Sequence, residues 1–261
     1  MSNFYSIVRK ELRDMFLSCI GSISHPAPGI HILNGHRTES ENESPDVFRH
    51  VLKHLSECAQ LTKIENAVRL INNRTIINEP IVAFTFDDGF TECYTHFAPA
   101  LEEFGINGLF FVNPNYVEGD DDYIENFDNH IVMTPGKIPM RWEHLIDLQR
   151  RGHIIGAHTM NHYMIASDDL QKLKYEIVNC KSEIEKHIAS PCDYFAFPYG
   201  KLSQASPQSI QIACDNYKYV FSQSDYKHYY SFDGKVINRR HFEPFWPISH
   251  IDYFLSCHKR Y

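Results

Sequence analysis

The sequence predicts an α/β fold in which a parallel sheet closes, or nearly closes, into a barrel. Short apolar runs typical of buried strands alternate along the chain with segments that have one apolar helical face, which is the pattern of a parallel sheet. The chain has 261 residues with 43% hydrophobic and 13% aromatic content, enough to form the core of one such domain. We therefore expect residues 1–261 to form a single domain.

The chain starts with a predicted amphipathic helix over residues 3–19. The most apolar part of this region, 15–23, follows a segment of mixed charge and contains Ser, Cys and Gly, unlike a secretory signal. No stretch of the sequence reaches the ~20 apolar residues of a membrane span. We expect the helix to pack on the barrel, with peripheral contact at a membrane surface as the alternative.

Residues 29–112 contain the clearest strand, 81–86, a continuous apolar run of the kind that parallel sheets bury. Ser44 and Pro45 are typical of a helix N-cap and a first helical position. Further strands are predicted over 29–34, near 61 and over 107–112, and helices from 44 onward, over 64–72 and over 91–104.

Residues 115–137 are polar and acidic, and we expect a long loop there, over one end of the fold. Beyond it, strands are predicted over 152–157, 194–197, 218–222 and 235–238, and helices over 141–151, from Ser167 onward, over 206–215 and over 247–258. In barrels of this kind the functional side chains gather at the carboxyl ends of the strands. The polar motifs described next follow predicted strands.

The composition excludes some classes of function. The formal net charge of −8 argues against nucleic acid as a partner, because phosphate binding requires a basic face. The seven cysteines are far apart and form no CxxC pair, which predicts reduced thiols rather than a disulfide framework. We therefore expect a cytoplasmic location, with membrane association as the alternative.

Two motifs indicate a metal site. Asp87 and Asp88 follow strand 81–86, so their side chains should point in different directions, one towards a cation and one free to accept a proton. His158 and His162 are four residues apart, so both imidazoles can meet one ion. Taken singly, the motifs also fit an Asx-type turn and two solvent-facing histidines. Together they favour a hydrolytic metal site with open positions for water.

A third motif, Phe195-Ala-Phe-Pro-Tyr-Gly200, ends a predicted strand in a turn. Its backbone N–H groups can face a developing oxyanion, and its aromatic side chains can form a wall on which a sugar stacks. An ordinary β-turn with a core aromatic is the alternative. His153, which precedes a predicted strand, is expected to be structural.

Three motifs resemble, in order and spacing, the first three motifs of the NodB-like polysaccharide deacetylases, carbohydrate esterase family 4. They are Thr85-Phe-Asp-Asp-Gly89, His158-Thr-Met-Asn-His162 and Phe195–Gly200. The segment from Trp142 to His158 is also similar to this family. The resemblance covers about residues 80 to 200 and implies a distorted (β/α) barrel of about seven parallel strands.

The resemblance also implies roles for single residues. Asp88, His158 and His162 would hold a divalent cation, Zn²⁺ or another such as Co²⁺, Ni²⁺ or Mn²⁺. Asp87 would be the general base, and the backbone N–H of Tyr199 would donate to the oxyanion. The implied reaction is hydrolysis of the N-acetyl group of an amino sugar in a polysaccharide or glycan intermediate.

The sequence departs from the family pattern at two points. Ala196 stands where the family often has an Arg that pairs with the catalytic Asp, so Arg240 or Arg37 is expected to replace it. The usual late Leu-x-His motif, which supplies the catalytic acid, is not evident. The segment Ile32-Leu-Asn-Gly-His-Arg resembles the strand-ending His of a circularly shifted branch that contains poly-N-acetylglucosamine deacetylases. His36 is therefore the expected general acid, with His241 as the rival.

Two other functions fit the same motifs. One is hydrolysis of a C–N bond in a small non-sugar amide. The other is an inactive carbohydrate-binding homologue, although retention of both carboxylates and both histidines favours an enzyme.

Overall fold

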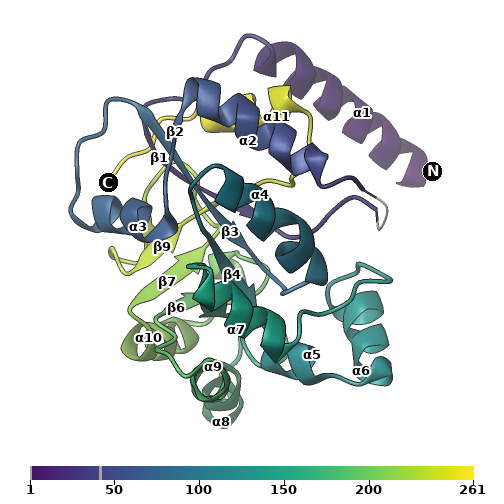
Figure 1. Cartoon of the computed structure of the whole chain (residues 1–261), viewed down its shortest axis with the longest axis vertical. Helices are drawn as coiled ribbons and strands as arrows, with labels where there is room; N and C mark the ends of the chain where they lie inside the picture. Colours follow the sequence, from purple (N-terminus) through teal and green to yellow (C-terminus); the bar gives the residue numbers. More distant parts are fainter. Residues whose placement is uncertain (1, 41–42) are drawn as a thin grey trace.

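A computed structural model describes residues 2–40 and 43–261 of the chain. Within these residues, ten strands form one sheet at the centre of the molecule (Figure 1). All neighbouring strands pair in parallel except β8 and β9, which are antiparallel. The strands are β1 (Gly29–Gly35), β2 (Gln60–Leu61), β3 (Pro80–Phe86), β4 (Gly108–Val112), β5 (Ile154–Ala157), β6 (Tyr194–Ala196), β7 (Tyr219–Ser222), β8 (Tyr230–Ser231), β9 (Val236–Asn238) and β10 (Arg240–His241).

Helices alternate with these strands along the chain and lie around the sheet (Figure 1). The α-helices are α1 (Ser2–Gly21), α2 (Asp46–Cys58), α3 (Ile64–Asn72), α4 (Ala98–Glu103), α5 (Pro114–Glu118), α6 (Asp121–Asn126), α7 (Trp142–Arg150), α8 (Leu170–Lys174), α9 (Cys180–Ile188), α10 (Pro207–Asn216) and α11 (Ile248–Leu255). Short π-helical or 3₁₀ segments are η1 (Cys93–Phe97), η2 (Phe127–Ile131), η3 (Tyr175–Asn179) and η4 (Leu202–Gln204).

The sheet closes through the chain itself. Its strand order is β10-β1-β3-β4-β5-β6-β7-β9-β8, so β10 and β9 pair with strands on opposite sides of the sheet. Only Arg239 separates β9 from β10 in sequence. Its backbone N–H donates to the Ser222 carbonyl at 2.8 Å, and the Phe242 N–H donates to the Asn34 carbonyl at 3.0 Å. The prediction of an α/β barrel is thereby confirmed, with β8 and β10 as additional short strands.

Side-chain alternation along the strands separates two cores. One set of alternate residues forms a cluster inside the barrel, which includes Ile32, Ala83, Phe111 and Phe221. The other set, which includes Phe84 on β3, packs with apolar residues of the surrounding helices in a larger cluster. Because the interior set continues to the strand ends, it determines which polar residues reach the barrel mouth.

The predicted loop over 115–137 is wrong for most of its length, because α5, α6 and η2 occupy residues 114–131. The Asp120 carboxylate caps α6 by accepting from the Tyr123 N–H at 2.9 Å. Tyr116 stacks on Phe127 with 4.0 Å between ring centroids, and both join Phe90 in a small separate core. Polarity alone gave the wrong prediction, since most of the acidic residues lie on the outside of short helices around this aromatic core, and the buried Asp128 accepts from the Tyr116 hydroxyl at 2.7 Å. At Ser44 the difference is smaller: α2 begins at Asp46, and Ser44 Oγ accepts from the Asp46 N–H at 3.2 Å.

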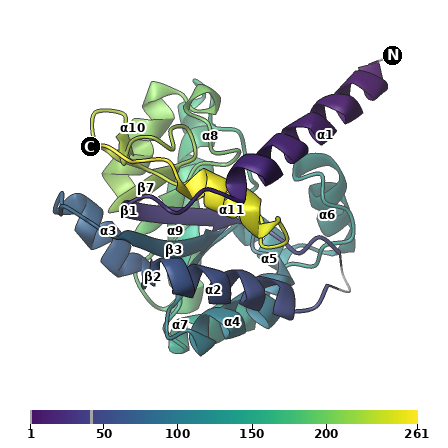
Figure 2. The ribbon, with the colours of Figure 1, turned by 90° about the horizontal axis from the view of Figure 1, so that it is seen from above.

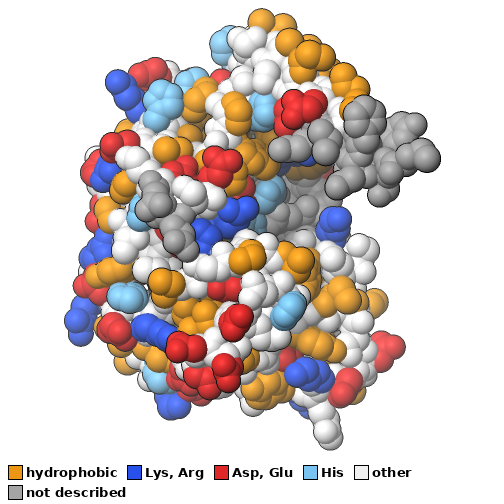
Figure 3. Space-filling model, turned by 90° about the vertical axis from the view of Figure 1, so that its right-hand side faces the viewer, with side chains coloured by type: hydrophobic (Ala, Val, Ile, Leu, Met, Phe, Trp, Pro, Cys, Tyr) orange, Lys and Arg blue, Asp and Glu red, His pale blue; other side chains and the backbone are white. Residues whose placement is uncertain are grey.

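Helix α1 contacts α11 near its own C-terminal end, and the rest of it projects from the molecule (Figure 2). Ser18 Oγ lies 3.1 Å from His250 Nε2, and a Cβ on Gly21 would come within 1.8 Å of the Ser249 carbonyl oxygen. Hydrophobic side chains, among them Val8 and Leu12, are exposed along α1 (Figure 3). Among the described helices, none is both long enough and apolar enough to cross a membrane.

Candidate metal centre and active site

Polar side chains line a cavity of about 610 Å³ at the carboxyl ends of the barrel strands. His36, which follows β1, Asp87, which follows β3, and His158, which follows β5, all line this cavity. Strand alternation explains the placement of two of them. Asp87 continues the interior set of β3 after Ala83 and Thr85, and His158 comes two residues after Gly156 on β5.

The three expected metal ligands lie together. One ligand atom from each of Asp88, His158 and His162 lies within 4.8 Å of the others. Asp88 Oδ1 is 3.7 Å from His158 Nε2 and 3.4 Å from His162 Nε2. Two ligand atoms each about 2.1 Å from one tetrahedral ion are separated by about 3.4 Å, so these distances fit a shared cation. Asp88 Oδ1 is buried and has no hydrogen-bond partner, which also fits a metal ligand.

An unusual backbone brings these ligands together. Asp88 has a φ of 72° and His162 a φ of 54°, in the left-handed region that residues other than glycine rarely adopt. At Asp88 this conformation breaks the strand alternation and turns the carboxylate towards the two histidines. Strain of this kind persists where surrounding contacts fix the loop, and it gathers at functional sites.

Hydrogen bonds fix the loop that carries both histidines. The side chain of Asn113, which follows β4, donates to the carbonyls of His158 and, at 2.9 Å, of Thr159. The fully buried Glu176 accepts from the backbone and side-chain N–H groups of Asn161 at 3.0 Å and 2.8 Å. Sequence reasoning did not find either supporting residue.

Both imidazoles are held in the neutral form that metal binding requires. Burial is the largest influence on each, and it lowers the pKa of His158 to about 4 and that of His162 well below its usual value. His158 Nδ1 lies 2.8 Å from the Ala196 carbonyl oxygen, to which it donates. That bond leaves the Nε2 lone pair of His158 facing Asp88. Ala196 therefore orients His158 through its backbone carbonyl.

Arg239 is the partner of Asp87. Its two terminal nitrogens donate to the two carboxylate oxygens at 2.8 Å and 2.9 Å, and Asn34 donates to Asp87 Oδ2 at 2.9 Å. Burial favours the neutral acid, but the charge and the hydrogen bonds of Arg239 hold the pKa of Asp87 well below its usual range. Asp87 is therefore an ionised, firmly oriented carboxylate.

The expectation that Arg240 or Arg37 pairs with Asp87 is wrong. The Arg240 guanidinium lies 4.0 Å from the ring centroids of Tyr226 and Phe254, outside the barrel interior, and Arg37 donates to the Thr38 carbonyl at 3.1 Å. The sequence did contain a signal for Arg239. In the predicted strand 235–238, Ile237 faces the barrel interior, so alternation directs residue 239 inward as well.

His36 lies on the other side of Asp87. Its Nε2 is 4.0 Å from Asp87 Oδ2, and its Nδ1 is 2.9 Å from Glu243 Oε1. Burial lowers the pKa of His36, but nearby carboxylates, Glu243 above all, raise it to about 9. His241 lines the same cavity, and burial together with the charge of His36 lowers its pKa to about 4. Glu243, whose charge and hydrogen bond raise the pKa of His36, was not found from the sequence.

Tyr199 forms part of the cavity wall, as does Met133, and both side chains are exposed. The ring of Tyr199 packs edge-on against His162 with 4.6 Å between centroids. Tyr199 has a φ of 62°, so it shares the strained left-handed backbone conformation of Asp88 and His162.

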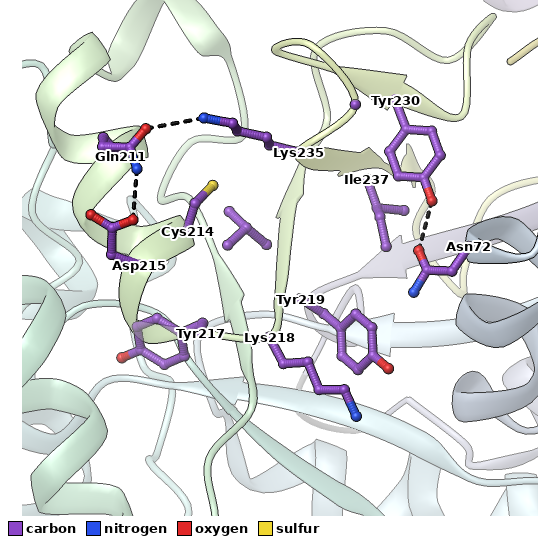
Figure 4. A pocket seen from close by; sticks show the side chains of 12 residues that line it. Asn72, Gln211, Cys214, Asp215, Tyr217, Lys218, Tyr219, Tyr230, Lys235 and Ile237 are labelled. Atoms are coloured by element: carbon purple, nitrogen blue, oxygen red, sulfur yellow. Dashed lines mark hydrogen bonds between the residues drawn. The ribbon is translucent and has the colours of Figure 1, made fainter.

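Another cavity, of about 390 Å³, lies beside the start of β7 and the start of β9 (Figure 4). Lys235 Nζ donates to Gln211 Oε1 at 3.1 Å there, and the Tyr230 hydroxyl donates to Asn72 Oδ1 at 2.6 Å. Its lining, all within the described residues, contains one carboxylate, Asp215, and no histidine. It does not offer a comparable set of metal ligands.

Comparisons with known proteins match this fold and region. The model of the family described as "Polysaccharide deacetylase" matches residues 76–214. A peptidoglycan-N-acetylglucosamine deacetylase from Bacillus cereus is 27% identical over 129 residues, which cover 49% of this chain and 50% of that protein. The match thus spans about half the length of the curated relative.

Solved structures share the fold. IcaB from Ammonifex degensii superimposes with a TM-score of 0.69 at 20% identity, over 89% of this chain and 99% of that one. The Streptococcus pyogenes deacetylase PplD, solved with acetate, gives 0.65 at 18% identity, over 88% and 99%. At these identities the likeness concerns the fold alone.

Proposed function

Because the chain belongs to the polysaccharide deacetylase family, we propose that it removes the N-acetyl group of an amino sugar in a polysaccharide or glycan intermediate. One observation carries this proposal: three buried ligand atoms of Asp88, His158 and His162 converge beside the ionised Asp87. The name of the Bacillus cereus relative, a peptidoglycan-N-acetylglucosamine deacetylase, supports the same substrate class.

The ligand set, one carboxylate and two neutral imidazoles, suits Zn²⁺ and also Co²⁺, Ni²⁺ or Mn²⁺. When bound, such a cation supplies Lewis acidity for the acetamide carbonyl and makes water more acidic. Burial raises the pKa of Asp88 to about 7, in spite of the charge of His36. A cation beside Asp88 would favour its ionised form.

The residues of the chain divide the remaining work. Asp87 accepts a proton from the attacking water, and the Tyr199 backbone N–H donates to the developing oxyanion. His36 donates a proton to the departing amine, because a pKa of about 9 keeps it protonated at neutral pH. His241, with a pKa of about 4, is neutral under the same conditions and suits this role less well.

We also propose that residues 1–261 act as one domain. Asn34 and Arg239 lie near opposite ends of the chain, and both bind Asp87. Arg239 lies between β9, which pairs with β7, and β10, which pairs with β1, so neither half of the chain would form this site alone.

Acetate release from a panel of N-acetylated saccharides tests the proposal, with small amides and ureides as the comparison. We expect turnover of the saccharides with added Zn²⁺ or Co²⁺ and none after chelation. Turnover confined to the small amides would show a different C–N hydrolase. Absence of turnover on every substrate in metal-loaded protein would contradict an enzymatic role.

Asp87→Asn separates proton transfer from metal binding. The variant should retain the cation, because Asp87 is not one of the three proposed ligands, and lose at least ~10²-fold in rate. Asp88→Asn should lose the cation itself, as elemental analysis of purified protein would show. Turnover of Asp87→Asn near that of the wild type would remove this carboxylate from the mechanism.

A further inference from the structure

We propose that the chain has another cation site, formed by His54 and Cys58 on α2 with Asp252 on α11. One ligand atom from each of the three residues lies within 4.8 Å of the others. None of them lines the cavity that contains Asp87 and the proposed catalytic cation. The site is therefore separate from the one described above.

The three side chains already point to one place. His54 Nε2 lies 2.9 Å and 3.0 Å from the two Asp252 oxygens, and Cys58 Sγ lies 4.0 Å from the same nitrogen. In a tetrahedral zinc site, a thiolate sulfur at about 2.3 Å and an imidazole nitrogen at about 2.1 Å are about 3.6 Å apart. Small side-chain movements would reach this geometry. His54 and Cys58 are four residues apart, one helical turn, so α2 presents both on one face.

Charge supports a divalent ion at this point. Asp252 is 9% exposed, and within the described residues His54 provides its only ion pair. A thiolate at Cys58 with the Asp252 carboxylate would carry two negative charges, which Zn²⁺ or Co²⁺ neutralises. Burial raises the pKa of the Cys58 thiol, and metal coordination reverses this by stabilising the thiolate. His54 is 29% exposed, which leaves a path for the ion and a place for water as the fourth ligand.

Two other ligand clusters carry less weight. In the cluster of His36, His241 and Glu243, both histidines line the catalytic cavity, and Glu243 is bound to His36 at 2.9 Å. In the cluster of Glu118, Glu183 and His187, each group already has another partner. Glu183 binds Lys186 at 2.7 Å, Glu118 accepts from Trp142 at 2.8 Å, and His187 stacks on that indole at 4.1 Å between centroids.

A cation at this site would join α2 to α11, and α11 in turn carries α1. Figure 1 shows α2, α11 and α1 together at the top of the molecule, and Figure 2 shows α1 extending beyond it. The proposed ion therefore has a structural role, since it would fix α11 to α2.

Cobalt titration of metal-free protein tests the site, because among the ligand clusters of the described residues only this one contains a cysteine. We expect about two equivalents of Co²⁺ per chain and a near-ultraviolet thiolate-to-cobalt charge-transfer band. In Cys58→Ser the band should disappear and binding should fall to about one equivalent. Asp252→Asn, which preserves the side-chain shape, should weaken the band-forming step at least ~10-fold.

Three variants serve as controls. His50→Ala changes an exposed histidine one turn earlier on α2, and Cys214→Ser changes another partly buried thiol, so both should keep the band. Asp88→Asn should lose the catalytic equivalent and also keep the band, which makes the two sites distinguishable. A wild-type protein without the band, or a Cys58→Ser protein that retains it, would overturn the proposal.

Discussion

Arg239 holds Asp87 with two nitrogens of a planar guanidinium, a geometry that lysine cannot reproduce. In Arg239→Lys we expect the metal content to stay unchanged and kcat to fall about 10- to 100-fold. Losses of this size are typical when a residue that orients a reacting side chain is replaced. The pKa of Asp87 should rise, because a single lysine ammonium replaces the two guanidinium N–H donors. The acid limb of the pH–rate profile should therefore move to higher pH. Steady-state kinetics across pH measures both effects.

The neighbouring arginine provides the control for this experiment. Arg240 lies against Tyr226 and Phe254, so Arg240→Lys should leave the acid limb where it is in the wild type. If both variants shifted the pH–rate profile equally, or neither did, the paired hydrogen bonds between Arg239 and Asp87 would have no specific role in orienting the proposed base.

At this scale, motifs predicted residues that depend on local spacing and missed those that depend on contact between distant segments. His158 and His162 share one loop, and Asp87 and Asp88 follow one strand, so their spacing carries information. Glu243 reaches His36 across 207 residues, and no pattern within either segment indicates that contact. Arg239 is intermediate, because strand alternation directs it inward but cannot choose it over Arg240 before β9 has been placed.

Strand β5 leads directly to His158, and it passes close to β4 at Gly156. A Cβ at this position would lie 2.6 Å from two ring atoms of Phe111, which packs inside the barrel beneath the Arg239 guanidinium. Gly156→Ala should therefore destabilise the protein by about 1–3 kcal/mol, the usual cost of overpacking a core. Denaturant unfolding measures this change.

A second substitution identifies the cause of that loss. Phe111→Leu removes the ring that the new methyl group meets, so Gly156→Ala with Phe111→Leu should be less destabilised than the sum of the single variants. Strictly additive losses would show that the Phe111 ring is not what excludes a methyl group at Gly156.

The elements that the sequence predicted well are those whose apolar pattern reflects burial in the main core. Strand 81–86 became β3 with a one-residue extension, and the strand over 218–222 became β7. Residues 114–131 were missed because their helices pack on a local aromatic cluster, so the segment as a whole has no long apolar stripe. Short helices around a small core are hard to distinguish from a polar loop by composition alone.

At the scale of the whole molecule, alternation of strands and helices predicted the barrel but not how it closes. The sheet closes because the chain pairs with β7 before residue 239 and with β1 after it. That step depends on two strands of two or three residues, β9 and β10, which lie below the length at which periodicity is informative. The same step places Arg239 in the barrel, so closure and orientation of Asp87 arise together.

Stability of the whole fold should decrease in mild acid through His31, a buried histidine outside the active site. His31 is 2% exposed, and its Nε2 donates to the Ala27 carbonyl at 2.8 Å. Burial, with smaller contributions from the charges of Lys259 and His258, lowers its folded-state pKa from 6.5 to about 4. The unfolded chain then binds a proton that the folded chain excludes, so stability falls as pH decreases from about 7 towards 4.

The size of this effect follows from the two pKa values. At pH 5, His31 alone should cost about 2 kcal/mol of unfolding free energy relative to pH 7.5. His31→Gln keeps an N–H donor for Ala27 but does not titrate. Between pH 7.5 and pH 5, its free energy of unfolding should therefore decrease by about 2 kcal/mol less than that of the wild type. Urea unfolding of both proteins at the two pH values, at equal metal concentration, measures the difference. Equal decreases in the two proteins would show that His31 has the same pKa in the folded and the unfolded chain, in spite of its burial.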